Sequence, residues 1–180
     1  MQPFPIFLSV HNQPIIVSGG GAAAVAKLRL LMKTTAQITV FCPHRSDDIH
    51  NWAAEGLLKL ERRALQAGDI TGARLFYGAN EQAEEDARTA ALVKTEGALT
   101  NIVGNLADSD FITTAIIDRD PVTVAIGTEG AAPVLARAIK ADLEATLPTN
   151  LSMLARIDKA FCDQPNALPY GRRRRTFWSE

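Results

Sequence analysis

The sequence predicts an α/β fold with a doubly wound parallel sheet. Short apolar runs rich in β-branched residues alternate along the first part of the chain with segments of helical periodicity. The first of these runs, QPIIVS, leads straight into three glycines, and a helical pattern starts directly behind them. Strands that alternate with helices at this spacing favour a parallel sheet, because each parallel connection has to cross the sheet.

The expected elements of this sheet can be placed in chain order. The first strand is followed by a helix, because apolar residues recur at helical spacing from Ala24 to Leu31. A second strand, AQITVFCP, is stopped by Pro43, and RLFYGAN is the third strand. A polar helix is expected over about 81–96, and TNIVGN is the fourth strand. The segment 51–72 stays open between a helix and an excursion that contains a strand.

The pattern changes after about Asp110. Two β-rich runs, FITTAIID and VTVAIG, are separated by a turn-like stretch with Pro121 and predict a hairpin. The helix that follows ends at Pro148 and has apolar residues four apart on one face: Leu135, Ile139, Leu143 and Leu147. A last helix is expected over about 150–162. A hairpin with one helix is small for an independent core, so we expect it to pack on a second copy of itself.

Composition excludes several classes of protein. With 180 residues, 47% of them hydrophobic, the chain can bury a core without disulfides. Cys42 and Cys162 are far apart and form no metal-ligand pair, and His11, His44 and His50 lack ligand spacing, so no metal is expected. No apolar run approaches the roughly 20 residues of a membrane span, and the start lacks the basic residues of a secretory signal. We expect a cytoplasmic protein, and its net charge of -1 predicts no overall attraction to nucleic acid.

The three glycines have the pattern of a dinucleotide-binding turn. In such a turn the first glycine makes the bend, the second lets the backbone approach the pyrophosphate, and the third position must be small. Gly19, Gly21 and Ala24 have this spacing, and the helix that follows turns its N–H groups toward the phosphates. The alternative is a flexible turn without a ligand. Where an acidic residue would bind the ribose stand Cys42 and Pro43, so these residues leave NAD and NADP open.

At this point the chain resembles the dehydrogenase/ferrochelatase module of siroheme synthases, which also occurs alone as precorrin-2 dehydrogenase. The resemblance is carried by FPIFL, VSGGGAAAVAKLRLL, ITVFCP, the long stretch FITTAIIDRDPVTVAIGTEGAAPVLARAIKADLEATLP, and RRRRTFW. Its most specific part is IIDRDP followed by APVLAR. The resemblance implies a homodimer that oxidises precorrin-2 to sirohydrochlorin with NAD, in siroheme or cobalamin biosynthesis, and some members then insert iron. It also implies a Rossmann-like domain (1–112), a dimerisation element (113–148) and a helical tail (149–180).

The resemblance also implies which residues contact the ligands. The cofactor-binding positions are Gly19, Gly20, Gly21, Ala22, Ala23, Ala24, Cys42, Pro43, Ala79 and Asn80. The substrate-binding positions are Asn101, Asn105, Arg119, Thr128 and Arg137. Thr128 stands before a helix, where its hydroxyl can donate to a tetrapyrrole carboxylate, and the two arginines suit bidentate carboxylate recognition. The alternatives are a capping role for Thr128 and salt bridges within the dimer for the arginines.

The sequence departs from the family where the family has its acid. Gly104 stands in place of the aspartate after the fourth strand, and Asn105 matches a second acid. Hydride transfer mainly needs the reactants to be positioned, whereas metal insertion needs a base for the ring N–H protons. We therefore expect a dehydrogenase with doubtful chelatase activity. Asp108 and Asp110 are candidate replacements, but we expect both to be solvated turn carboxylates.

Two alternatives stay open. The loss of the acid favours a non-catalytic homologue that binds a nucleotide or a tetrapyrrole. A dehydrogenase for another substrate would use the same glycine turn with a changed pocket, but the retained IIDRDP segment argues against much change.

Overall fold

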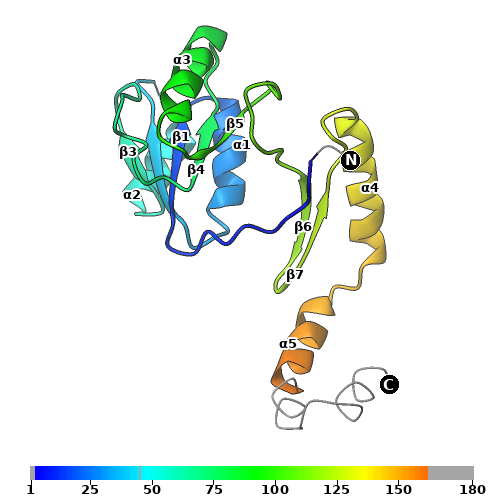
Figure 1. The fold of residues 1–180 in the computed structure, drawn as a ribbon. Coiled ribbons are helices and arrows are strands. Elements are labelled where there is room, and N and C mark those ends of the chain that lie inside the picture. Colours follow the sequence, from blue (N-terminus) through cyan, green and yellow to red (C-terminus); the bar gives the residue numbers. More distant parts are fainter. Residues whose placement is uncertain (1–2, 45, 162–180) are drawn as a thin grey trace, which may run out of the picture. The chain divides into compact units, whose positions relative to one another are not determined.

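A computed structural model describes residues 3–44 and 46–161, with side chains to residue 157. The chain divides into two compact units, Met1–Thr113 and Thr114–Glu180, and each is described by itself. The first unit contains β1 (Pro14–Ser18), α1 (Ala22–Leu31), β2 (Gln37–Phe41), α2 (Asp47–Ala54), β3 (Lys59–Glu61), β4 (Leu75–Gly78), α3 (Ala83–Lys94) and β5 (Leu99–Ile102), as drawn in Figure 1.

The five strands of the first unit form one parallel sheet in the order β3-β2-β1-β4-β5. The predicted doubly wound sheet is therefore confirmed. The order reverses between β1 and β4, because β2 lies on one side of β1 and β4 on the other. In open α/β sheets ligands bind outside the carboxyl ends of the strands at this reversal. The reversal therefore locates the functional edge of the sheet, directly behind β1 and β4.

Strand β1 is central to the core because both of its faces are buried. Ile15 and Val17 lie in an apolar cluster with α1 and α2, whereas Ile16 lies in a second cluster with α3. Successive side chains of a strand point to opposite faces, so an unbroken apolar run suits a strand that is covered on both sides. Ala24 and Leu28 of α1 are fully buried against the first face. This packing holds the start of α1 close to the end of β1.

The segment 51–72, which the sequence left open, contains the end of α2, the short strand β3 and then turns. Gly56 follows α2 in the left-handed region, at a φ of 75°, and separates the helix from β3. After β3 the turns are closed by a bidentate ion pair, because the Nη1 and Nη2 atoms of Arg63 each lie 2.7 Å from an oxygen of Asp69. The connection from β3 to β4 therefore has no helix, unlike the others in this sheet.

The second unit contains the antiparallel pair β6 (Ala115–Arg119) and β7 (Val122–Ile126), and the helices α4 (Pro133–Thr146) and α5 (Leu151–Phe161). The predicted hairpin and both helices are confirmed. Ala136 of α4 and Ile117 of β6 are buried, while Leu135 is 54% exposed, so the covered face of α4 includes the alanine rather than that leucine. The RRRRTFW stretch and the rest of the chain beyond residue 161 lie outside the described residues.

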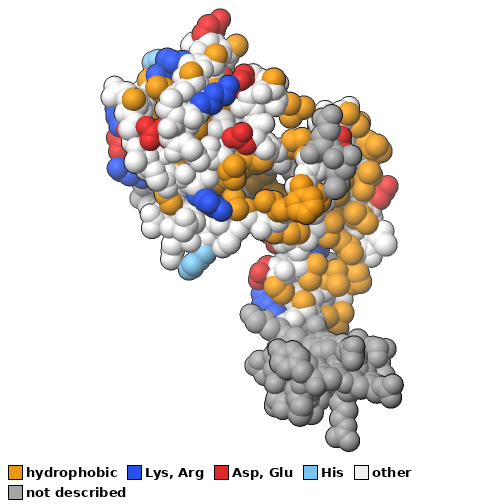
Figure 2. Space-filling view, in the orientation of Figure 1, with side chains coloured by type: hydrophobic (Ala, Val, Ile, Leu, Met, Phe, Trp, Pro, Cys, Tyr) orange, Lys and Arg blue, Asp and Glu red, His pale blue; other side chains and the backbone are white. Residues whose placement is uncertain are grey.

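Apolar side chains are exposed on the helices of the second unit. Figure 2 shows them over α4 and α5, and the exposed ones are Val134, Leu135, Met153, Leu154 and Ile157. Exposed apolar patches of this kind commonly mark a surface that another molecule covers. No helix in the described part of the chain is long and apolar enough to cross a membrane.

Candidate functional site

The glycine turn lies at the reversal of the sheet, behind the end of β1. Gly19 has a φ of 128°, and a Cβ at this position would collide with the carbonyl oxygen of Ala79 behind β4. Its N–H donates to the carbonyl of Phe41 at the end of β2, at 3.0 Å. Only glycine combines this backbone conformation with so close an approach. The first glycine of the pattern is thus required because the ends of β1, β2 and β4 approach each other closely at this point.

The second and third positions of the pattern also have physical reasons. Gly21 is the N-cap of α1, which has neither a side-chain cap nor an acidic residue in its first turn. The first N–H groups of that helix are therefore not satisfied by a cap and form the positive end of its dipole. Ala24 is fully buried against the sheet, where a larger side chain would push the helix away. The turn is held from the other side by Ser46, whose N–H donates to the carbonyl of Gly20 at 3.1 Å.

A chain of three polar side chains fixes the loop behind β4. The Ser18 hydroxyl donates to the Asn80 side-chain oxygen at 3.2 Å. Asn80 in turn donates to one carboxylate oxygen of Asp86, from its backbone N–H at 3.1 Å and from its amide nitrogen at 2.7 Å. Ser18 and Asp86 are buried, with 2% and 9% of their surface exposed. The end of β1, the loop and the first turn of α3 are thereby tied together beside the glycine turn.

This network leaves Asn80 with some capacity to bind a ligand. A side-chain amide has two N–H donors and an oxygen with two lone pairs. Asp86 uses one donor and Ser18 uses one lone pair, so one of each remains. The remaining donor and acceptor suit a ribose hydroxyl or a carboxamide.

Sequence reasoning assigned no role to Asp86, although a signal was present. Asp86 lies on the same helical face as Thr89, Ala90 and Val93, all of which are buried. Residues three, four and seven positions apart lie on one face of a helix. Asp86 therefore shares the face of α3 that packs against the sheet. A charged group there needs a partner, because an unpaired buried charge is costly. The partner, Asn80, is supplied by the loop before the helix.

The predicted positions behind β2 contribute no charge. Cys42 is buried, with 2% of its surface exposed, and its N–H donates to the carbonyl of Glu61 at 3.1 Å. Pro43 is exposed directly behind it. Neither side chain has the carboxylate that binds the ribose hydroxyl in other dinucleotide folds.

The segment behind β5 explains why glycine stands in place of the family acid. The N–H of Asn105 donates to the carbonyl of Ile102 at 3.1 Å, and Gly104 is the third residue of this turn, at a φ of 82°. A turn with this conformation at its third position favours glycine. Nothing lies within 4 Å of a Cβ built at Gly104. The backbone conformation, rather than lack of space, therefore favours glycine here.

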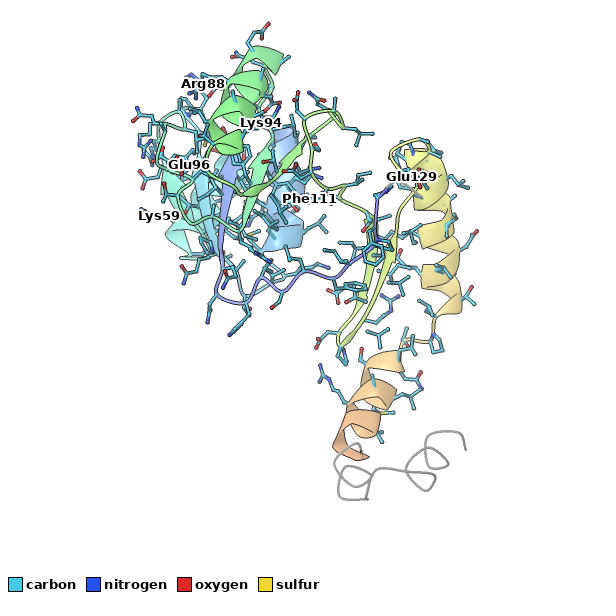
Figure 3. The ribbon with its side chains drawn as sticks, viewed as in Figure 1. Lys59, Arg88, Lys94, Glu96, Phe111 and Glu129 are labelled. Atoms are coloured by element: carbon cyan, nitrogen blue, oxygen red, sulfur yellow. The ribbon has the colours of Figure 1, made fainter. Side chains whose placement is uncertain are left out.

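Two predicted substrate residues flank this turn. Asn101 is buried, and its amide donates to the carbonyl of Phe111 at 2.8 Å. Phe111 is labelled in Figure 3. The Asn101 amide thus holds the following segment against β5. The Asn105 side chain is exposed, and its oxygen accepts from the N–H groups of Ala107 and Asp108 at 3.0 and 3.3 Å. Both residues have local structural roles, and their contact with substrate stays a prediction.

The two candidate replacement acids are both engaged. Asp108 accepts from the amide of Asn105 at 2.8 Å and lies 3.3 Å from the ammonium of Lys94, labelled in Figure 3. The hydrogen bond from Lys94 lowers the pKa of Asp108, which makes the carboxylate a weaker base. Asp110 accepts from the N–H of Thr100 at 2.9 Å, near the start of β5 rather than its end. Both carboxylates are thus held by other groups of the protein.

Lys27 and Tyr77 form a further contact that the sequence analysis did not predict. The Lys27 ammonium lies 5.7 Å from the centroid of the Tyr77 ring, which in turn meets the ring of Phe111 edge-on at 5.4 Å. Burial lowers the pKa of Lys27 and raises the pKa of Tyr77. Both groups are thus shifted toward their uncharged forms on the α1 side of the sheet.

The other predicted substrate residues belong to the second unit. Arg119 donates to the carbonyl of Asp118 at 3.2 Å, and Arg137 donates to the carbonyl of Pro133 at 3.3 Å. The carbonyl of Thr128 accepts from Ala131 at 2.9 Å, just before α4, and its hydroxyl forms no cap on that helix. Among the described residues, no group of three or more His, Cys, Asp or Glu side chains is placed to hold a metal ion.

Comparison with known proteins agrees with this arrangement. Residues 6–115 match the family described as putative NAD(P)-binding. The siroheme synthase of Methylococcus capsulatus is 37% identical over 179 residues, which are 99% of this chain and 38% of that protein. The siroheme synthase of Pseudoalteromonas atlantica is 33% identical over 181 residues, covering 100% of this chain and 39% of that protein. A solved structure, SirC, precorrin-2 dehydrogenase, has the same fold, with a TM-score of 0.77 at 23% identity over 96% of this chain and 85% of that one.

Proposed function

The chain belongs to the putative NAD(P)-binding family, and from this premise we propose that it oxidises precorrin-2 to sirohydrochlorin with NAD. The resemblance to siroheme synthases expected from the sequence is confirmed by matches over the whole chain. The chain spans about two fifths of the length of those relatives, at 39% and 38%. The observation that supports the proposal best is the glycine turn at the reversal of the sheet, with the uncapped start of α1 behind it.

The residues of the turn fit a dinucleotide. The missing side chain at Gly21 lets a pyrophosphate approach the backbone, and the first N–H groups of α1 attract its charge. Asn80, held by Asp86, offers one donor and one acceptor to a ribose or to the carboxamide. When bound, NAD supplies the hydride acceptor. The chain itself positions the reactants, and the released proton passes to solvent.

Chelation is the weaker activity in this proposal. Inserting a metal ion releases ring N–H protons, which need a base. Gly104 cannot accept a proton, and Asp108 and Asp110 are held by other partners. We therefore expect slow or absent iron insertion beside measurable dehydrogenation.

The test is anaerobic oxidation of precorrin-2 by the purified protein. NADH absorbance and sirohydrochlorin formation are followed with NAD and NADP in parallel, and NAD binding is measured by calorimetry. Turnover with NAD supports the proposal. NAD binding without turnover rejects the dehydrogenase and favours a binding role. Iron insertion as fast as that of a relative with the acid would contradict the expected chelatase defect.

A second candidate is a non-catalytic homologue that binds a nucleotide or a tetrapyrrole. Gly104 is the observation that favours it. The Gly104→Asp variant distinguishes the two, because the site has open space and aspartate tolerates a positive φ better than most residues. Gly104→Asn is the matched control, with the same shape and no acid. Activity only in the aspartate variant would show that the natural protein is not primarily a catalyst.

The assembly and the substrate contacts in the second unit complete the proposal. The exposed apolar side chains of α4 and α5 support a homodimer, to be tested by analytical ultracentrifugation. Arg119, Thr128 and Arg137 are proposed to bind the carboxylates of precorrin-2. The Arg137→Met variant should then raise KM more than it lowers kcat. The predicted three-part division and the cytoplasmic location stay predictions.

A further inference from the structure

We propose that Glu81 sets the affinity of the glycine turn for NAD, because its carboxylate occupies the place of the pyrophosphate in the free protein. The inference rests on the proposed cofactor and adds a residue outside the predicted cofactor-binding positions. Glu81 follows Asn80 in the loop between β4 and α3.

The observation is the position of the Glu81 carboxylate. A Cβ built on Gly21 would overlap this carboxylate before it met any other group. Gly21 is the second glycine of the pattern, where the backbone and the pyrophosphate approach each other. The missing side chain at Gly21 therefore leaves a space that an anionic group of the protein itself fills.

The backbone of the loop directs Glu81 to this place. The Ala79 N–H donates to the carbonyl of Ser18 at 2.8 Å, and the Asn80 N–H is held by Asp86. Residue 81 consequently begins from a fixed point beside the turn. Its side chain, by contrast, is exposed and forms no hydrogen bond or ion pair within the described part of the chain. The carboxylate can therefore leave without breaking a specific contact.

Charge explains why the carboxylate lies there and what its displacement costs. Helix α1 has no acidic residue in its first turn and no side-chain cap, so its positive end lacks an anion from its own sequence. An anion at such an end is stabilising by an amount that corresponds to about two- to fivefold in an equilibrium constant. A pyrophosphate bound there would repel the carboxylate and replace it. Whatever stabilisation Glu81 gives the free protein is thus subtracted from the binding of NAD.

The experiment compares the full chain with the variants Glu81→Gln and Glu81→Ala. The matched control is Glu84→Gln, which removes another exposed carboxylate of the same region, in the first turn of α3. Calorimetry measures the affinities for NAD and NADH. Thermal unfolding is recorded with no nucleotide and with saturating NAD.

The expected result is about two- to fivefold tighter binding of both nucleotides by both Glu81 variants, with Glu84→Gln unchanged. The free Glu81→Gln protein should unfold about 1–3 °C lower than the natural one, and saturating NAD should remove that difference. Unchanged or weaker binding by the Glu81 variants would overturn the inference and leave the cofactor standing. If neither the natural chain nor any variant bound a nucleotide, the proposed cofactor would be wrong and the inference with it.

Discussion

Replacing Asp86 tests whether the buried network behind β4 positions the cofactor. The carboxylate accepts two hydrogen bonds from Asn80, at 3.1 and 2.7 Å, with 9% of the residue exposed. A hydrogen bond to a charged group contributes about 1.5–3 kcal/mol to stability. Two effects reduce the loss expected for Asp86→Ala: both hydrogen bonds use the same carboxylate oxygen, and the variant no longer buries a charge. Asp86→Ala should therefore lower the free energy of unfolding by about 2 kcal/mol. Asp86→Asn retains a carbonyl acceptor and should lose about 1 kcal/mol.

Urea unfolding followed by tryptophan fluorescence measures these losses, and calorimetry measures the affinity for NAD under conditions where every variant is folded. Because Asn80 would turn away without its acceptor, Asp86→Ala should bind NAD about tenfold more weakly, a loss of about 1.4 kcal/mol. Asp86→Asn should recover most of that affinity. A purely structural role would lower stability in both variants and leave the NAD affinity unchanged. Full stability in Asp86→Ala would refute the reasoning outright.

Two further predictions concern the glycine turn and the dependence of the free energy of unfolding on acidic pH. Gly19→Ala should abolish NAD binding and cost about 2–3 kcal/mol of unfolding free energy, because the new Cβ adds a clash with Ala79 to an unfavourable φ. Gly68→Ala, also at a positive φ but with open space, should cost about 1 kcal/mol and leave NAD binding intact, as calorimetry would show. The hydrogen bonds from Arg63 lower the pKa of Asp69, so this carboxylate stabilises the fold above its unfolded pKa of about 3.9. That contribution is lost as the pH falls through the lower folded pKa. In the Asp69→Asn variant, the free energy of unfolding in urea should therefore decrease less steeply as the pH is lowered. An unchanged slope would contradict the stabilising role of the Asp69 carboxylate.

Local patterns in the sequence were enough to predict much of the fold. The unbroken apolar run of β1 and the helical spacing from Ala24 onward are set by neighbours within a few residues, and such patterns depend on backbone periodicity alone. The turn at Gly19 was predictable for the same reason, because the pattern of three small positions is contiguous. The segment 51–72 was not, since a three-residue strand such as β3 has too few residues to show a period.

The sequence by itself therefore determined the doubly wound sheet, the hairpin with its helices and the place of the glycine turn. Only the tertiary structure decided what surrounds that turn. Ser18 meets Asn80 across 62 positions of the chain, and Glu81 meets Gly21 only because β4 pairs beside β1. The order of the strands and the direction of the side chains bring such residues together. Their spacing along the chain does not predict these contacts. The same holds for Gly104, whose sequence position suggested only a lost acid, whereas its backbone shows a turn that favours glycine.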